Sequence, residues 1–578
     1  MGTIKLNKKK EKEILKFLDS RFKYLEELRD PIDKAILADI DLYNDIDTEN
    51  AALSSWKTKG TIAYLYAIVQ TIVARMLQSL YGKQNYLKVY MEKDVYKPIE
   101  KPFRKWLQSI LDGMNFKYRA RDFLEEALIQ RTTWIHLRPT LGKDDKLLKT
   151  DFNVYQWFDV WCDTGVKEVE ESDFFIRKVF PLWKIKSDPK LYPMNVDKIK
   201  DSTPPDYIKE KQIYKSKNQT TYYDPTTIFN TLDKVETKEY YGVYDLSDNP
   251  DKPDYKYVLF VTANDTVLLR AETIDLKTKR KILIFPIRPI RQANSIIGKS
   301  IPQIAGKLQK TLNFVFTHLL TNYKLNTGLM FKYKKNSGVD MDELFSEEGN
   351  AVGFDEDPNE VGVFETPNTV QLGTYMMGQV MQLIQQLTGA VDSVMGVSTG
   401  GTATETKAVL DQAMFKFSMM AENVVGDILK FINYVIILQQ KYNLKEILKE
   451  YPEFVDFFKQ TEEELELNKT IDLGLNDLTM RRDIERAQYI NLLNALIPLI
   501  QSTQANQPEF LRTVMNTMEM ENTETIMEGA KTAKEIQQEQ MIMMLQAQAQ
   551  TQAKANAAQN SQAPTNASPE EDAMQVNS

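Results

Sequence analysis

The sequence predicts an α+β fold that is mainly helical, and three observations support this. Apolar residues recur at the helical period of 3.6 over most of residues 1–135, and again from Ile301 to about Ala549. Between about Phe152 and Ile287, short β-branched and aromatic runs are separated by Asp, Asn, Pro and Gly, which predicts an antiparallel, hairpin-rich sheet. The composition is 42% hydrophobic and 27% charged over 578 residues, so the chain can bury the cores of several domains.

The N-terminal helices are expected around four apolar groups, namely Ile14–Leu18, Ile62–Leu77, Phe103–Leu111 and Phe123–Leu128. The strands are expected in the runs YQWFDVW, FFIRKVF, EYYGVYDL, YKYVLFV, TVLLRAETI and KILIFPI. Together these segments predict a helix-rich opening followed by a sheet.

Two amphipathic helices of equal length follow, over residues 301–326 and 370–395. The apolar stripe of the first is Ile301, Ile304, Leu308, Leu312, Val315, Leu319 and Tyr323, and that of the second is Met377, Val380, Ile384, Leu387, Val391 and Val394. Ser300 is a candidate N-cap of the first helix, with Pro302 in its first turn. At about 1.5 Å per residue each helix would reach roughly 39 Å. The segment between them, residues 327–369, has Gly, Pro and Asn punctuation and strand-like pieces, so we expect a helical hairpin with a β-rich tip.

Charge is segregated along this hairpin. No acidic residue occurs from Leu276 to Val339. The basic residues of that run are Lys277, Lys279, Arg280, Lys281, Arg288, Arg291, Lys299, Lys307, Lys310, Lys324, Lys332, Lys334 and Lys335. The tip then turns acidic, with Asp340, Asp342, Glu343, Glu347, Glu348, Asp355, Glu356, Asp357, Glu360 and Glu365. The simplest interpretation is two solvated faces that keep an elongated element in solution, and a docking function is the alternative.

Beyond the second helix, Gly396, Gly400 and Gly401 predict a loop, and Thr402 with Glu405 forms a capping box for a further helix. That helix keeps its period to about Lys441. A helical block is expected from about residue 478 to 520. The Ala, Gln and Asn composition beyond about Gln546 cannot bury enough apolar area to offset the entropy of ordering, so we expect the end of the chain to be disordered.

No enzyme signature emerges from the sequence. One cysteine, Cys162, and two histidines, His136 and His318, provide neither a disulfide framework nor a Cys/His zinc site, and all three are expected to pack rather than to catalyse. The motif ANSIIGKS, residues 293–300, lacks the first glycine of a phosphate-binding loop, so it more simply begins a helix. Nearby carboxylates such as Asp144 with Asp145 have no further metal ligand beside them. We therefore expect no catalysis, no cofactor and no metal site.

Two classes of partner are also disfavoured. The longest apolar stretches, residues 62–80 and 424–438, contain Gln70, Arg75, Asp427 and Lys430, so buried helices are expected there rather than membrane spans. The charged residues that follow Met1–Lys10 are not those of a secretory leader. The net charge of -8 does not attract nucleic acid to the protein as a whole.

Two stretches are informative beside the order of elements: RPIRQANSIIGKSIPQIAGKLQKTLN lies before and within the first long helix, and LTGAVDSVMGVSTGGTATETKAVL covers the end of the second helix and the loop that follows. With this order of elements, they resemble the portal, or head-to-tail connector, proteins of tailed double-stranded DNA bacteriophages. The resemblance extends over about residues 50–530. It implies a wing of N-terminal helices and sheet at 1–295, a stem at 296–326 and 370–395, a clip at 327–369, and a tunnel loop at 396–404. It further implies a long wing helix with following helices at 405–475 and a helical crown at 476–550, before the disordered tail at 551–578.

The resemblance also implies a function, which is that of a ring of twelve subunits at one capsid vertex, assembled in the host cytoplasm, through which the genome is packaged and ejected. Its partners would be double-stranded DNA held weakly and without sequence specificity, the major capsid protein, the terminase packaging motor, and head–tail adaptor or tail proteins, with no membrane partner. The alternative from a different class is an intracellular helical adaptor or scaffold that binds other proteins and forms no closed ring.

Individual residues can be assigned on this basis. The tunnel loop would contain Gly396, Ser398, Thr399, Gly400, Gly401 and Thr402, and the docking surface of the clip would contain Asp340, Asp342, Glu343, Asp355, Glu356 and Asp357. A channel that lets DNA move should bear few cations, because each neutralised phosphate adds affinity, so Gln379, Gln382 and Gln386 are candidates for the pore face. The basic residues of the stem, Lys299, Lys307, Lys310 and Lys324, would contact DNA transiently or meet an acidic neighbour or capsid surface, and the sequence does not choose between these.

Overall fold

The computed structural model describes residues 2–4, 6–46, 60–81, 86–141, 147–199, 234–247, 253–327, 331–333, 361–363, 367–390, 403–467 and 469–473. All of them belong to one compact unit, Met1–Asn476. The predicted crown, the tail, the tunnel-loop residues Gly396–Thr402 and the acidic residues of the tip lie outside the described residues.

The N-terminal part is helical where the apolar period predicted helices. Its long helices are α1 (Lys8–Tyr43), α3 (Tyr64–Tyr81), α4 (Glu100–Gly113) and α5 (Phe116–Gln130). Helix α1 begins at Asn7, whose side chain accepts a hydrogen bond of 2.8 Å from the Lys10 backbone N–H, as an N-cap residue does.

Two antiparallel sheets follow. The larger has the strand order β1-β9-β8-β7-β6-β5 and the smaller the order β10-β3-β4. Their strands are β1 (Gly2–Thr3), β3 (Thr133–Leu141), β4 (Leu147–Tyr155), β5 (Val160–Cys162), β6 (Phe174–Pro181), β7 (Lys234–Asp245), β8 (Tyr255–Ala263), β9 (Val267–Thr273) and β10 (Ile284–Ile287). The antiparallel prediction is confirmed, but its N-terminal boundary was too late, because β3 pairs with β4 already from Trp134.

Short elements complete this part. They are η1 (Asp94–Ile99), η2 (Trp157–Asp159), η3 (Val169–Glu171), α6 (Leu182–Ser187), η4 (Val196–Lys198), η6 (Pro452–Phe454), α14 (Val455–Phe458) and α15 (Glu462–Leu467). A further pair of strands joins β2 (Leu87–Met91) to β13 (Lys469–Leu473), although no strand was predicted in either segment.

Two of the apolar clusters in the described part of the chain show how these elements pack. One face of α1, with Ile14, Leu18, Phe22 and Leu25, packs on side chains of the larger sheet that include Phe175, Tyr240 and Phe260. The other core surrounds Phe431 of helix α13 (Ala403–Glu450), whose ring lies 5.5 Å from that of Phe116, 5.4 Å from Phe152 and 5.9 Å from Phe285. Helix α13 therefore joins α5 to the smaller sheet.

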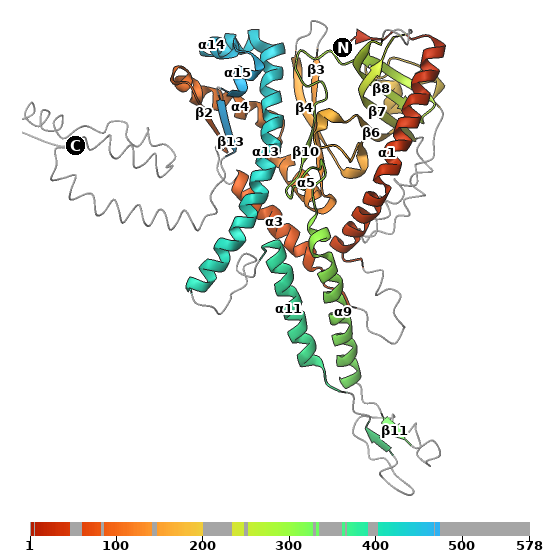
Figure 1. Ribbon diagram of the computed structural model, residues 1–578, viewed down its shortest axis with the longest axis vertical. Helices are drawn as coiled ribbons and strands as arrows, with labels where there is room; N and C mark the ends of the chain where they lie inside the picture. The colour runs from red at the N-terminus through yellow and green to blue at the C-terminus, as the bar shows by residue number, and fades with distance from the viewer. Residues whose placement is uncertain are drawn as a thin grey trace, which may run out of the picture. The chain divides into compact units, whose positions relative to one another are not determined.

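The predicted hairpin is present as α9 (Ile301–Thr327) and α11 (Val370–Thr388), which run side by side in Figure 1. At its tip, β11 (Phe331–Tyr333) pairs antiparallel with β12 (Val361–Val363). Two boundaries differ from the prediction. Helix α11 ends at Thr388 rather than at 395, because Gly389 adopts a left-handed conformation with φ 81°. Helix α13 begins at Ala403, as the capping box of Thr402 with Glu405 predicted, although the tunnel loop was assigned to residue 404, and it continues past Lys441 to Glu450.

Candidate functional site

The hairpin root, defined here as residues 288–300, connects the smaller sheet to α9. Ser300 caps α9, because its Oγ accepts a hydrogen bond of 3.0 Å from the Gln303 N–H. The same hydroxyl donates to Oδ2 of Asp39 in α1 at 2.8 Å, and Arg131, which follows α5, donates to that oxygen at 3.0 Å. Burial raises the pKa of Asp39 above its usual range, although Ser300 and Arg131 oppose this effect. One carboxylate thus fixes the start of α9 to two helices.

The glycine of the motif GKS has a packing role in the root. A Cβ at Gly298 would lie 2.5 Å from the carbonyl oxygen of Arg131 and 2.8 Å from that of Ile290, so only glycine fits there. The Gly298 N–H donates to Thr132 Oγ1 at 3.0 Å. These contacts explain the motif without a bound phosphate.

A second buried carboxylate, Asp427 of α13, holds the other end of the root. Its side chain is 1% exposed. Oδ1 accepts hydrogen bonds from Arg288 Nη2 at 3.0 Å and Arg291 Nη2 at 2.7 Å, and Oδ2 accepts one from the Arg288 backbone N–H at 3.0 Å. The guanidinium groups of Arg288 and Arg291 thus bind the same carboxylate, and these hydrogen bonds fix the position of the root relative to α13.

From Gln309 onward, the buried face of α9 is mostly polar. Gln309, Asn313 and Thr317, four residues apart and 1% to 2% exposed, form what we call the polar row. The row binds the extended segment that precedes α3. Gln309 Nε2 donates to the Ile62 carbonyl at 2.6 Å, the Ile62 N–H donates to Asn313 Oδ1 at 3.1 Å, and Thr317 Oγ1 donates to the Gly60 carbonyl at 3.0 Å.

The predicted apolar stripe of α9 is therefore only partly correct. Leu312 is buried, but Leu308, Val315 and Leu319 are half-buried, and Tyr323 is 58% exposed. The polar row was not predicted, because amide and hydroxyl side chains do not contribute to the apolar period. The regular four-residue spacing of amide and hydroxyl side chains was the signal that could have revealed it.

Helix α11 packs on α9 through small and polar contacts near the tip. Asn322 Nδ2 donates to the Pro367 carbonyl at 2.9 Å, and Gly373 leaves room for Leu319, whose Cδ1 would lie 3.2 Å from a Cβ there. At its other end, Gln385 Nε2 donates to the Tyr64 hydroxyl at 2.7 Å, and Lys416 Nζ donates to the carbonyl oxygens of Gln386 and Leu387. A lysine at the last carbonyls of α11 also complements the helix dipole.

The outer face of α11 is unusual in its chemistry. The helix contains no charged residue at all. Leu372, Met376, Leu383 and Leu387, here called the apolar row, are 46% to 62% exposed and fall within about 60° of one another at 100° per residue. The predicted pore residues Gln379, Gln382 and Gln386, the glutamine row, are also exposed and lie next to the apolar row on the helix. An uncharged, partly apolar face of this length is typical of a surface that another protein covers.

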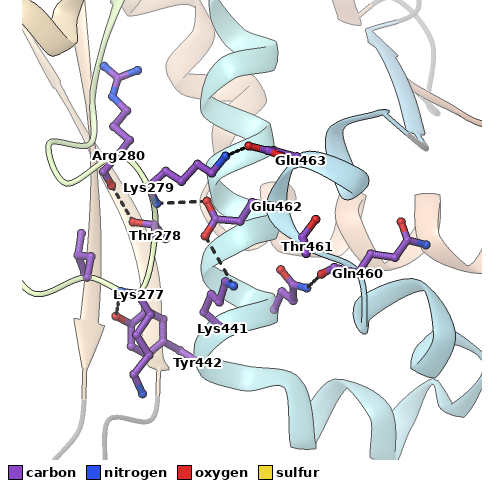
Figure 2. A network of polar contacts seen from close by, with 12 residues as sticks. Lys277, Thr278, Lys279, Arg280, Lys441, Tyr442, Gln460, Thr461, Glu462 and Glu463 are labelled. Carbon is purple, nitrogen blue, oxygen red and sulfur yellow. Dashed lines mark hydrogen bonds and ion pairs between the residues drawn. The ribbon is translucent and has the colours of Figure 1, made fainter.

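Much of the basic run before the hairpin is neutralised within the chain. Figure 2 shows the loop 277–280 against α13 and α15, where Lys279 pairs with Glu463, its N–H donates to Glu462 at 3.2 Å, and the Lys277 N–H donates to Tyr442 at 2.9 Å. Arg280 pairs with Glu170 at 2.9 Å. Arg288 and Arg291 contact Asp427, as described above. Four further basic residues, Lys299, Lys307, Lys310 and Lys324, are exposed on α9 and at its start.

The three residues considered for catalysis are placed as follows. Cys162 is buried in β5, and burial raises the pKa of its thiol to about 12. His136 is buried between the rings of Tyr155 and Tyr241, and burial lowers its pKa well below the usual value. His318 on α9 packs edgewise on Phe314, with 4.3 Å between the ring centroids.

Within the described residues, no group of three or more His, Cys, Asp or Glu side chains could hold a metal ion. No described helix is both long enough and apolar enough to span a membrane.

A family model described as the phage SU10 portal protein matches residues 155–560, which is more than two thirds of the chain and includes the whole hairpin. No curated protein matches the chain.

Proposed function

Because the chain belongs to the phage SU10 portal protein family, and is thus a structural phage protein and head–tail connector, we propose that its copies form a ring at one vertex of the capsid. The ring would be the conduit for genome packaging and ejection, and the platform for the packaging motor and the tail adaptors. Twelve copies per ring is the number that the resemblance implies. Assembly in the host cytoplasm and contact with the major capsid protein complete the proposal.

The observation that carries this proposal is the outer face of α11. Four exposed apolar side chains on an uncharged helix are costly in water, at roughly 25 cal/mol per Å² of apolar area, and nothing among the described residues covers them. A neighbouring copy in a ring would cover the apolar row by a head-to-tail contact, in which one face of a subunit meets a different face of the next. The partner face that we propose lies on α9 around Phe314, which is 60% exposed.

The glutamine row is proposed to face the channel. Gln379, Gln382 and Gln386 are polar and uncharged, so they can be hydrated beside DNA without releasing counterions from its phosphates. The exposed lysines Lys299, Lys307, Lys310 and Lys324 would grip DNA if they lined the channel. We therefore assign them to an acidic protein surface outside it, of the capsid or of a neighbour.

Two further sites remain proposals from the sequence, because they lie outside the described residues. Gly396, Ser398, Thr399, Gly400, Gly401 and Thr402 would form the tunnel loop. Asp340, Asp342, Glu343, Asp355, Glu356 and Asp357 would form the docking surface for the packaging motor and the tail adaptors. In the sequence, the docking-surface residues lie between α9 and α11, and the tunnel-loop residues follow α11. This is the order that a stem, a clip and a tunnel loop would have along the chain.

The proposal is tested by the mass and the shape of the purified protein. Sedimentation and negative-stain images should give a closed ring with a central hole. The helical adaptor or scaffold, the second candidate, predicts a monomer or a small open complex. A discrete species without a hole would favour that candidate.

A further inference from the structure

A cleft of about 760 Å³ lies in the N-terminal part of the chain, between the β3–β4 hairpin and strands β7, β8 and β9 of the larger sheet. Its walls come from β3, β4, β7, β8 and β9, and the segments at Lys190 and Lys281 complete its rim. We propose that this cleft binds a phosphate-bearing organic anion of about the size of a nucleotide. The proposal does not depend on ring formation, because no residue of the hairpin lines the cleft.

Charge is the first argument. Five cationic side chains line the cleft, namely Arg138, Lys149, Lys190, Arg270 and Lys281, against two acidic ones, Asp151 and Glu272. Both acidic groups already have partners, since Asp151 accepts from Lys149 at 2.8 Å and Glu272 from Arg270 at 2.7 Å. The lining therefore keeps an excess of three positive charges, and a cleft between protein walls concentrates such a field.

The floor of the cleft does not cancel this excess. Glu239 is buried and contacts two lining residues, since it accepts from the Tyr241 hydroxyl at 3.1 Å and lies 3.5 Å from Arg138, and its charge is balanced by Lys178 at 2.7 Å. His136 also lines the cleft, but burial lowers its pKa well below the usual value, so it adds no charge to the lining.

The type of anion follows from the rest of the lining. Two arginines present planar guanidinium groups, which match the paired oxygens of a phosphate. Leu191, Leu259, Ile274, Leu276 and Leu283 supply an apolar wall, so the ligand should carry an apolar or aromatic part as well. The volume is within the range of ligand pockets, about 300 to 1,000 Å³. A nucleotide combines these features, whereas a simple carboxylate does not.

The test is isothermal titration of the full-length protein with three probes in metal-free buffer: ATP, inorganic triphosphate and citrate. We expect ATP to bind with a Kd below about 1 mM, triphosphate to bind more weakly, and citrate to bind at least about tenfold more weakly than ATP. Equal binding of ATP and triphosphate would overturn the apolar part of the proposal. Equal binding of citrate would overturn its phosphate selectivity.

Variants locate the site. Lys190→Glu combined with Lys281→Glu should weaken ATP binding at least about tenfold, because both substitutions reverse charge at the rim without touching buried Glu239. The matched control is Lys186→Glu, an exposed lysine close in sequence that does not line the cleft. Thermal melting without ligand checks that each variant is folded. No binding of ATP by the native protein, or equal binding by the double variant and the control, would overturn the proposal.

Discussion

At the scale of single residues, buried carboxylates fix the parts of the chain that carry the hairpin. Asp39 and Asp427 come from α1 and α13, which are remote from each other in sequence, and each accepts hydrogen bonds from the hairpin root. Asp39 also accepts one from Arg131, which follows α5. Removing one member of a buried, hydrogen-bonded charge pair leaves the other charge uncompensated, which costs more than the pair itself contributes. Conservative substitutions at these positions should therefore have large effects.

Asp427→Asn should destabilise the subunit by about 3 kcal/mol, because Arg288 would keep its charge in a largely buried position without a carboxylate. The measurement is chemical denaturation, with hydrogen exchange of residues 288–300 as the local readout. Arg291→Gln is the control, since the Arg291 side chain is 40% exposed and should matter less. Equal stability of Asp427→Asn and the native protein would show that the root is held by other contacts.

Glu239 provides a prediction for pH. Burial alone would raise the pKa of this carboxyl, but the charges of Lys178 and Arg138 outweigh burial and lower it from 4.5 to about 2. The folded pKa lies below the unfolded one, so the stability from this group is fully present above pH 4.5 and is lost as pH falls toward 2. The shift corresponds to about 3 kcal/mol.

Glu239→Gln should accordingly lower the free energy of unfolding at pH 7 by an amount of this order. The difference between variant and native protein should shrink when both are compared near pH 2.5, with urea denaturation as the measurement. A difference that is the same at both pH values would mean that the charge of Glu239 does not contribute.

At the scale of elements, the polar row makes α9 dependent on a segment from the N-terminal part of the chain. Thr317→Val keeps the shape of the side chain but removes the hydroxyl that donates to the Gly60 carbonyl. We expect a loss of about 1 to 2 kcal/mol in the free energy of unfolding, together with faster hydrogen exchange at residues 60–63. Thr311→Val is the matched control, because the Thr311 hydroxyl is exposed and donates only within its own helix. Similar losses in the two variants would argue against a specific role of the row.

The apolar row of α11 makes a separate prediction about assembly. Leu383→Asp combined with Leu387→Asp should leave the subunit folded, because both side chains are about half exposed, and should prevent ring formation. Gln379→Asp combined with Gln382→Asp is the control on the same helix, with the same added charge, and it should still give rings. Substituting Leu312 would not serve this purpose, because Leu312 is buried within the chain. Rings formed by the leucine variant would remove the apolar row from the subunit interface.

How much of these elements the sequence could predict depends on the kind of contact. The apolar period located α1, α3, α4, α5, α9 and α13, because burial of one face leaves a regular pattern. Strand β3 was not predicted, because WIHLRP contains a proline, which weakens a strand pattern, and because one of its partners, β10, is remote in sequence. Asp427 was noticed as a charge within an apolar stretch, but its partners lie about 136 to 139 residues away and no local pattern indicates them. Nothing in the sequence indicated the cleft, because its walls come from five separate strands.

At the scale of the whole molecule, the family of portal proteins and the chemistry of the hairpin support the same account. The chain separates an uncharged helix, α11, from a helix with exposed lysines, α9, and it uses buried ion pairs to hold the base of both. Such a division suits a ring, in which one face must meet DNA without binding it tightly and another must meet protein. The central claim is therefore that α11 presents its glutamine row to a channel and its apolar row to a neighbouring copy.

An electron cryomicroscopy reconstruction of the purified assembly, at a resolution that shows side chains, tests this claim most directly. The account predicts a closed ring in which Gln379, Gln382 and Gln386 line the central channel. It also predicts that Leu383 and Leu387 are covered by α9 of the next copy, near Phe314. A ring in which the lysines of α9 line the channel while the glutamine row lies outside it, or an assembly without a closed ring, would contradict the account.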